Sequence, residues 1–343
     1  MRILILGGGW FLGRTLAKDA LARGWDVEAF TRGRSGRPPA GVRHIVGDRT
    51  KEADLHRLAN EGPWDAVVDT SAYEPIDVAH VTNTLGDRID QYVLVSTVSA
   101  YQDWPATAVD ETSPLWPSAP TYTENSPELA SMTIGERYGT LKAGCEIAAT
   151  TGAARSLIAR PGVILGPGEY VGRGLKLLER AAQGRRWLLP APSEQPIQPV
   201  DVRDVSRFLL DAIEHRLDGA YNVVAPEDHA TYGDLIDMCL KLTGHRAQPT
   251  WVDPQWLIEH GVRQWTEIPL WRTPEGTWKV DGRQAAKAGL TCRPLSDTMQ
   301  DFKLALDRDG LIEHPRQNQL GLEPEREAHL LAEWDKMSGA RQR

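Results

Sequence analysis

The sequence is poor in cysteine and has no clustered metal ligands. Its 343 residues include three cysteines, Cys145, Cys239 and Cys292, which lie far apart and form no Cys-x-x-Cys pair. An odd number of distant cysteines excludes a disulfide scaffold and is typical of reduced thiols in the cytoplasm. The 9 histidines show neither HExxH nor Cys/His spacing, so we expect no metal site.

Long apolar runs and an excess of basic charge are also missing. No stretch approaches the roughly 18 consecutive apolar residues that a membrane-spanning helix needs. Residues Met1–Leu6 are apolar but run directly into glycines rather than into a cleavage site. The 39 basic residues are outnumbered by 47 acidic ones, giving a net charge of −8, and this leaves no basic footprint for nucleic acid. We therefore expect a cytoplasmic protein whose partner is a small molecule, not a membrane or a nucleic acid.

What the sequence does contain is an alternation of strands and helices in its N-terminal half. A chain of 343 residues corresponds to about two domains. Apolar, β-branched runs predict five strands, and helical spacing between them predicts βαβ units. The five predicted strands are Arg2–Leu6, Asp26–Thr31, Val42–Val46, Trp64–Asp69 and Gln91–Ser96. The predicted fold class is α/β: a doubly wound parallel-sheet Rossmann fold with a smaller C-terminal substrate-binding domain.

A glycine-rich turn joins the first strand to a predicted helix over Arg14–Arg23. Such a turn lets the backbone approach a dinucleotide pyrophosphate, and the helix N-terminus supplies N–H donors. The spacing of the glycines fits a tight turn followed by close helix packing. The residues predicted to bind the cofactor here are Gly7, Gly9, Trp10, Phe11, Leu12 and Gly13.

The end of the second strand bears on the choice between NADP and NAD. NAD enzymes place a carboxylate there for the ribose 2′-hydroxyl, whereas NADP enzymes place an arginine near the 2′-phosphate. Here Thr31 is followed by Arg32 and Arg34, and Glu28 lies inside the strand. We therefore favour NADP (NADPH) and keep NAD open, with Thr31, Arg32 and Arg34 as cofactor residues.

A tyrosine and a lysine four residues apart suggest the chemistry. Tyr138 and Lys142 begin a predicted helical stretch that continues through Ala149, so they share one helix face. A nearby ammonium favours the phenolate and brings a tyrosine toward acid–base work near neutral pH. A neutral hydroxyl to hold a carbonyl oxygen could come from Ser96, Thr97 or Ser99 at the end of the fifth strand.

Several motifs resemble the extended short-chain dehydrogenase/reductase superfamily, also called the NAD-dependent epimerase/dehydratase family, in an atypical form. They run from Met1 to Val223 and include the glycine turn and the Tyr-Lys pair. The other matching segments are Gly47–Arg49, Ser96–Tyr101, Val109–Leu115, Arg160–Pro167, Pro199–Val205 and Tyr221–Val223.

The resemblance implies roles for particular residues. Thr97, Tyr138 and Lys142 would be catalytic, with Lys142 also binding the nicotinamide ribose, and Asp48 would face the adenine. It also implies cofactor contacts from a further set, Arg49, Ser71, Pro161 and Val163. Candidate substrate contacts are Ser99, Tyr101 and Trp104.

The departures from the family pattern are informative too. Trp10 stands where the family usually has the middle glycine of its turn. Val98 and Ser99 occupy the positions where 4,6-dehydratases carry Asp-Glu, which argues against a dehydratase. The asparagines typical of sugar-nucleotide epimerases are lost or blurred at Thr82–Gly86 and at Arg160–Gly162.

The C-terminal half breaks the alternating pattern. We expect residues 1–165 to form the cofactor domain, with 195–225 returning to it, and 166–194 with 226–310 to form a substrate-binding lid. Residues 311–343 are expected to be a helical tail on the sheet or on a partner subunit, which leaves a homodimer open. Helices are predicted at Gly172–Arg185 and Tyr232–Leu242, loops at Pro190–Pro199 and Thr250–Thr277.

Three functions compete at this point. The leading one is an NADPH-dependent ketoreductase with Tyr138 as general acid. Its substrate would be bulky and partly aromatic, such as a polycyclic natural product, because the chain has 12 Trp and tryptophan suits stacking on flat rings. The alternative is a nucleotide-sugar epimerase with retained NAD. The third is a non-catalytic nucleotide- or RNA-associated protein.

Overall fold

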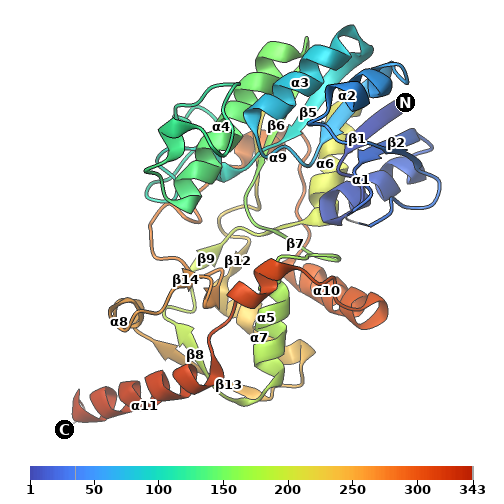
Figure 1. Cartoon of the computed structure of the whole chain (residues 1–343). Coiled ribbons are helices and arrows are strands. Elements are labelled where there is room, and N and C mark those ends of the chain that lie inside the picture. The colour runs from blue at the N-terminus through green and yellow to red at the C-terminus, as the bar shows by residue number, and fades with distance from the viewer. Residues whose placement is uncertain (35, 342–343) are drawn as a thin grey trace. The chain divides into compact units, whose positions relative to one another are not determined.

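The computed structural model describes residues 1–34 and 36–341, which fold into two compact units (Figure 1). Unit 1 consists of Met1–Ile164, Pro199–Pro226 and Glu275–Cys292. Unit 2 consists of Leu165–Gln198, Glu227–Pro274 and the chain from Arg293 onward.

The seven-stranded sheet of unit 1 has the strand order β11-β6-β5-β4-β1-β2-β3, and its pairings are parallel. Its strands are β1 (Arg2–Leu6), β2 (Asp26–Thr31), β3 (Arg43–Val46), β4 (Trp64–Asp69), β5 (Ile89–Val95), β6 (Ser156–Pro161) and β11 (Gly219–Val223). The helices of this unit are α1 (Phe11–Ala22), α2 (Glu52–Ala59), α3 (Pro75–Leu85), α4 (Ile134–Gly152), α6 (Val202–Glu214) and α9 (Arg283–Lys287). The predicted doubly wound Rossmann sheet is confirmed.

Helices cover both faces of this sheet (Figure 1). Along β1, Ile3 and Ile5 join the core under α1 and α6, whereas Leu4 and Leu6 join the core under α2, α3 and α4. A strand buried on both faces must be apolar at consecutive positions, which is why β1 reads as one apolar run.

Unit 2 is smaller and is built around α5 (Arg173–Ala182) and α7 (Tyr232–Leu242). It also contains the parallel pair β8 (Arg185–Pro190) and β13 (Ala247–Val252). Its remaining elements are β9 (Pro196–Ile197), β12 (Ala230–Thr231), α8 (Pro254–Glu259), β14 (Gln264–Trp265), β15 (Ile268–Pro269), α10 (Leu295–Asp309) and α11 (Pro324–Arg341). Two short strands, β7 (Ile164–Leu165) and β10 (Val200–Asp201), pair with each other where the chain changes units.

Two segments lie elsewhere than the sequence analysis placed them. Glu275–Cys292 belongs to unit 1, because Val109 N donates to Lys279 O at 3.2 Å and Asp281 N donates to Val109 O at 2.8 Å. The expected tail belongs to unit 2, where Glu327 of α11 pairs with Arg180 at 2.7 Å. Residues 342 and 343 of that tail lie outside the described residues.

Part of unit 2 that was predicted to be irregular has regular structure. Thr250–Val252 belongs to strand β13, and α8 follows it with Asp253 as its N-cap, accepting from Trp256 N at 2.9 Å. The predicted helix Gly172–Arg185 ends at Ala182, since Arg185 already begins β8. Tryptophan rings pack within this unit. Trp256 stacks on His260 with ring centroids 3.8 Å apart and meets Trp334 edge-on with ring centroids 5.3 Å apart.

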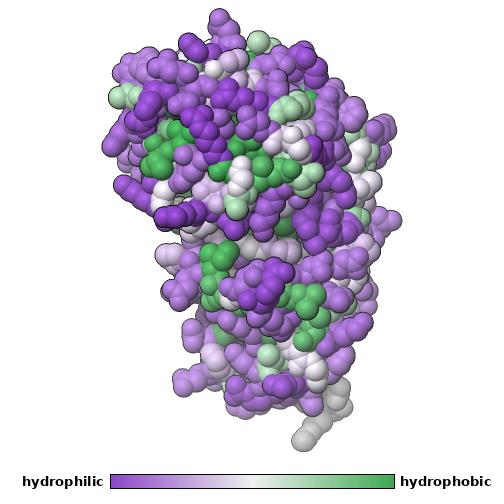
Figure 2. Space-filling view, turned by 90° about the vertical axis from the view of Figure 1, so that its right-hand side faces the viewer, coloured by the Kyte–Doolittle hydropathy of each residue, from purple (hydrophilic) through white to green (hydrophobic). Residues whose placement is uncertain are grey.

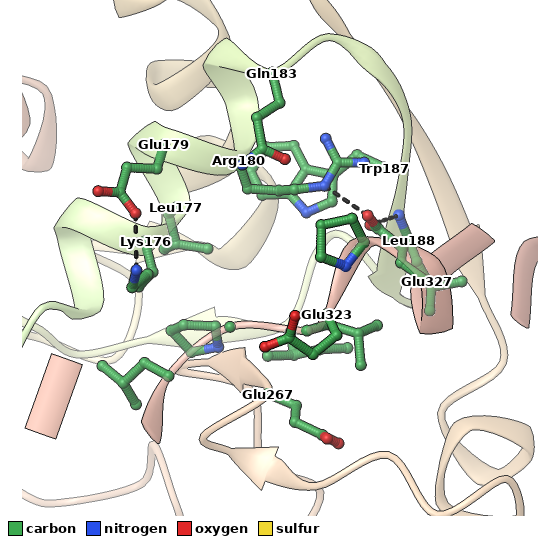
Figure 3. Close-up of a pocket in the computed structure, with 16 residues that line it drawn as sticks. Lys176, Leu177, Glu179, Arg180, Gln183, Trp187, Leu188, Glu267, Glu323 and Glu327 are labelled. Carbon is green, nitrogen blue, oxygen red and sulfur yellow. Dashed lines mark hydrogen bonds and ion pairs between the residues drawn. The ribbon is translucent and has the colours of Figure 1, made fainter. Parts of the chain in front are cut away.

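A cavity of about 230 Å³ lies within unit 2 between α5 and the segment Leu320–Pro324 (Figure 3). Two ion pairs stand in its wall, Lys176–Glu179 at 3.0 Å and Arg180–Glu327 at 2.7 Å. The charged side chains of these pairs neutralise one another within the protein.

The surface is mainly polar on the face drawn in Figure 2, where hydrophobic residues gather in small separate patches. Within the described residues, no helix combines the length and the apolar character needed to cross a membrane. The described residues also contain no group of three His, Cys, Asp or Glu side chains able to hold a metal ion.

Candidate functional site

The glycine turn after β1 is packed so tightly that side chains do not fit there. Gly7 has φ of 98°, and a Cβ on it would stand 2.8 Å from Thr70 Oγ1 and 2.9 Å from Ser71 Cβ. A Cβ on Gly13 would collide with the carbonyl oxygen of Gly7. Thr70 Oγ1 holds the turn by donating to Leu6 O at 2.9 Å. The turn therefore presents bare backbone at the carboxyl end of the sheet, as a bound pyrophosphate requires.

Helix α1 begins directly after this turn. Its N-cap residue is Trp10, whose side chain makes no capping hydrogen bond. The indole packs instead beside the loop after β2, because a Cβ on Gly36 would lie 3.4 Å from Trp10 Nε1. Phe11 starts the helix with φ of 35°, and Leu12 is buried. The Trp10 indole is therefore placed against the loop after β2 and makes no cap of the first-turn N–H groups.

The end of β2 carries no carboxylate. Glu28 is buried, and its carboxylate accepts from Arg2 at 2.7 Å, Trp64 Nε1 at 2.8 Å and Arg43 at 2.9 Å. Burial alone would raise the pKa of Glu28, but these hydrogen bonds outweigh it and lower the pKa. Glu28 is therefore committed elsewhere.

Basic side chains take the place of that carboxylate. Arg32 and Arg34 are exposed just beyond β2. Thr31 Oγ1 lies 2.8 Å from His44 Nε2 and accepts from Gly33 N at 3.1 Å, which fixes the turn that carries the two arginines.

The loop after β3 contains Asp48 and Arg49. Asp48 Oδ1 accepts from Thr50 N at 3.1 Å and from Thr50 Oγ1 at 2.9 Å. Burial raises the pKa of Asp48, but the Thr50 hydrogen bonds and the charge of Arg32 lower it overall. Arg49 is turned inward to Asp69, and its Nη1 lies 3.5 Å from Ser71 Oγ.

Thr97 lies two residues after the end of β5. It is the N-cap of the short helix η2 (Val98–Ala100), and its Oγ1 accepts from Ser99 N at 3.2 Å. The hydroxyls of Thr97 and Ser99 are 3.4 Å apart. Two small hydroxyl side chains therefore stand together at the carboxyl end of the central sheet.

Tyr138 and Lys142 lie on α4, which begins at Ile134 with a capping box formed by Thr133 and Glu136. The ammonium of Lys142 is buried and donates to Ala72 O at 2.9 Å and Val95 O at 2.7 Å. Both acceptors follow or end strands of the sheet, so Lys142 is anchored at the carboxyl ends of β4 and β5. Tyr138, one turn earlier, is 39% exposed.

Gly139 brings α4 against η2. A Cβ on Gly139 would collide with Ser99 O and would stand 2.8 Å from Trp116 Cδ1. The absence of a side chain there allows the backbone that carries Tyr138 to approach the segment that carries Thr97 and Ser99. This close approach brings the three predicted catalytic residues into one region of unit 1.

We expect Gly139→Ala to lower turnover strongly and to lower the free energy of unfolding only moderately. The added methyl group must push α4 away from η2, a form of overpacking that costs roughly 1–3 kcal/mol, and it displaces Tyr138 from Thr97. Turnover and thermal unfolding would be compared with those of Gly135→Ala, where an added Cβ meets no atom within 4 Å. Equal turnover in the two variants would contradict the expected role of the contact.

A buried polar network lies behind these residues. Glu146, one turn after Lys142, accepts from Ser96 Oγ and from Arg160, whose Nη2 is 2.6 Å from Glu146 Oε2. Arg160 Nη1 donates to Tyr101 OH at 2.8 Å, and Tyr101 OH donates to Asn222 Oδ1 at 2.7 Å. The network therefore binds Ser96 and Tyr101, the two ends of the segment Ser96–Tyr101 that contains Thr97.

The predicted substrate residues Tyr101 and Trp104 are held by contacts inside unit 1, and the predicted cofactor residues Pro161 and Val163 lie at the end of β6 and just beyond it. Tyr101 is fully buried, so its hydroxyl is used inside the unit, and burial raises its pKa to about 12. Trp104 is half-buried and donates to Thr277 O at 3.2 Å. Pro161 ends β6, and Val163 O accepts from Val200 N at 2.9 Å.

Asp69, Glu146 and Asn222 are structural partners of the site that have no predicted role. Glu146 carries a readable signal, because it follows Lys142 by four residues and so continues the helix face of Tyr138 and Lys142. Asp69 binds Arg49 and Asn222 binds Tyr101, and these partners are 20 and 121 positions apart in the sequence. No local sequence pattern predicts such pairs.

The fold defines the class of protein. The sheet order and the bare glycine turn have the arrangement of a Rossmann-fold dinucleotide-binding domain. The sequence model of the NAD dependent epimerase/dehydratase family matches residues 3–224, and the chain belongs to this family.

Solved structures share the fold across nearly the whole chain. A protein of Burkholderia cenocepacia is similar with a TM-score of 0.67 and 22% identity, covering 90% of this chain and 98% of its own. The Bordetella bronchiseptica enzyme WbmH in complex with NAD+ is similar with a TM-score of 0.66 and 16% identity, covering 90% of this chain and 99% of its own. UDP-glucuronic acid 4-epimerase from Bacillus cereus in complex with NAD is similar with a TM-score of 0.65 and 16% identity, covering 90% of this chain and 100% of its own. The curated proteins contain no match.

Proposed function

We propose that the protein is an NADPH-dependent oxidoreductase that reduces a carbonyl group of a small molecule. The observation that carries the choice of cofactor is the end of β2, where Glu28 is bound to Arg2, Arg43 and Trp64 and where Arg32 is exposed. An arginine there suits a 2′-phosphate, and no carboxylate competes for the 2′-hydroxyl. Net reduction draws on NADPH, which connects the cofactor to the direction of the reaction.

The residues present fit such a dinucleotide. The turn at Gly7 and Gly13 has room for backbone only, which is the cradle that a pyrophosphate needs. When bound, NADPH supplies the hydride that reduces the carbonyl carbon. Arg32 would hold the 2′-phosphate, while Asp48 and Ser71 would lie beside the adenosine half.

The chain itself supplies the proton. Tyr138 donates its phenolic proton to the carbonyl oxygen, so that hydride and proton together give the alcohol. The Thr97 hydroxyl donates a hydrogen bond to the same oxygen and orients it. Lys142 uses two of its N–H groups on Ala72 O and Val95 O, so one N–H remains that would bind the ribose hydroxyls.

A nucleotide-sugar epimerase with retained NAD is the second candidate. Membership of the epimerase/dehydratase family favours it, and two similar structures, WbmH and the Bacillus cereus epimerase, are complexes with NAD. In that reaction Tyr138 would remove and return the proton of one hydroxyl group. The blurred asparagines and the exposed Arg32 favour the reductase.

The substrate of the reductase is proposed to be bulky, with Trp104 and Trp116 in the loop between β5 and α4 as its flat contact surfaces. Trp256 and Trp334 support this less, because they pack on each other. A panel of polycyclic ketones and small sugars, each assayed for NADPH oxidation, separates a bulky substrate from a small one.

A paired titration with NADPH and NADH tests the proposed function. We expect tighter binding of NADPH, and Arg32→Ala should raise its Kd about 10-fold or more, since a charge-assisted hydrogen bond contributes about 1.5–3 kcal/mol. The Kd of NADH should stay within about twofold, and Arg88→Ala, at an exposed arginine, serves as the control. Purified protein carrying NAD+, with no preference for NADPH, would favour the epimerase instead.

A further inference from the structure

A buried ion pair lies below the adenosine side of the proposed cofactor site. Asp69 is the last residue of β4 and is 0% exposed, and the side chain of Arg49 is 12% exposed. The guanidinium binds both carboxylate oxygens, with Nη1 3.0 Å from Oδ1 and Nη2 on Oδ2. Such a two-pronged contact fixes the orientation of both groups.

Asp69 has further partners that complete its hydrogen bonding. Its carboxylate accepts from Tyr92 OH at 2.6 Å and from Ser71 N at 3.0 Å. Burial raises the pKa of Asp69, but the charge and hydrogen bonds of Arg49 lower it overall, so the group stays ionised. Both terminal nitrogens of the Arg49 guanidinium are therefore used by this carboxylate.

The pair connects three separate pieces of the proposed site. Arg49 directly follows Asp48, and the charge of Arg32 lowers the pKa of the Asp48 carboxyl group. Through Asp69 and its own Nη1, Arg49 also holds Ser71. Ser71 in turn packs on the glycine turn, since a Cβ on Gly7 would lie 3.1 Å from Ser71 Oγ. One ion pair thus sets the loops after β3 and β4 against the turn after β1.

We propose that Arg49 is a positioning residue for the dinucleotide and not a ligand of its phosphate groups. If Arg49 turned toward a phosphate, Asp69 would become a buried charge without a counter-ion, which is strongly unfavourable. Arg49 instead positions Ser71 through Asp69 and positions Asp48 as its neighbour in the chain. Asp48 and Ser71 would serve NADPH and NADH alike. Discrimination at the 2′-phosphate is left to Arg32. This inference rests on the proposed binding of a dinucleotide.

The test is fluorescence titration of the full chain with NADPH and with NADH, alongside thermal unfolding. Arg49→Met should raise both Kd values by a similar factor, about 10-fold, and leave their ratio unchanged. Arg49→Lys retains the charge but not the fork and should lie between Arg49→Met and the wild type. Arg186→Met is the matched control, because it removes a two-pronged Arg–Asp pair, with Asp335 at 2.6 and 3.0 Å, from the surface of unit 2.

Each outcome has a distinct meaning. A larger rise for NADPH than for NADH would make Arg49 a direct ligand of the 2′-phosphate and overturn the inference. Unchanged Kd values with a lower Tm would give Arg49 a purely structural role and overturn it as well. Should Arg49→Met fail to fold, Arg49→Lys gives the same comparison of ratios. Failure of the wild type to bind either nucleotide would instead remove the proposed function, and this inference with it.

Discussion

Tyr138→Phe is expected to lower kcat for carbonyl reduction by about 10²–10⁴-fold, the range that a positioned general acid contributes. The phenyl ring keeps the contacts of the tyrosine ring but has no proton to donate. Thr97 could still hold the carbonyl oxygen, and Lys142 would remain anchored on Ala72 O and Val95 O. The loss should therefore fall on the chemical step and not on cofactor affinity.

The measurement combines single-turnover kinetics with NADPH titration. The Kd of NADPH should stay within about twofold, and Tm should change little, because Tyr138 is 39% exposed and surface substitutions usually change stability by at most about 0.5 kcal/mol. Tyr122→Phe removes the hydroxyl of another tyrosine of unit 1 and should retain full activity. Unchanged kcat in Tyr138→Phe would exclude Tyr138 as the proton donor.

Arg160→Met is expected to lower the free energy of unfolding by about 3–5 kcal/mol, the usual cost of removing one partner of a buried ion pair. Arg160 and Glu146 are 6% and 4% exposed. Without the guanidinium, the Glu146 carboxylate would keep Ser96 Oγ as its side-chain donor, and Tyr101 OH would lose the hydrogen bond from Arg160. A buried charge would then be left without its counter-ion.

Urea unfolding followed by tryptophan fluorescence measures this loss. The double variant Glu146→Leu with Arg160→Met should recover much of the stability, since replacing both members of a buried pair by apolar residues is often close to neutral. Arg186→Met removes an exposed pair and should cost at most about 1 kcal/mol. A loss of that small size in Arg160→Met would show that the network contributes little to stability.

The sheet of unit 1 was largely predictable from sequence because its strands are buried on both faces. Such strands must be continuously apolar, and β1, β2 and β4 have the predicted bounds. The predicted helical stretch began at Tyr138, whereas helix α4 begins four residues earlier, at Ile134. The Thr133-x-x-Glu136 capping box was the local signal that would have given its start.

The site was predictable only where its residues are neighbours in sequence. The spacing of Tyr138 and Lys142 places them on one helix face, and the order of glycines marks the turn after β1. The inward orientation of Arg49 and the carbonyl partners of Lys142 depend on how β4, β5 and α4 meet, and contacts of this kind leave no periodic trace. The same applies to Glu275–Cys292, which follows a Pro- and Trp-rich stretch yet returns to unit 1.

The threefold division of unit 1 has a consequence for synthesis on the ribosome. Domains generally fold as units, starting from the N-terminus. When residue 226 leaves the ribosome, Val109 still lacks its backbone partners Lys279 and Asp281, and Asn222 lacks its acceptor on Asp281. Unit 1 must therefore wait, incomplete, while Glu227–Pro274 of unit 2 are made. A nascent chain arrested before Glu275 should remain sensitive to protease, and one arrested well beyond Cys292 should not.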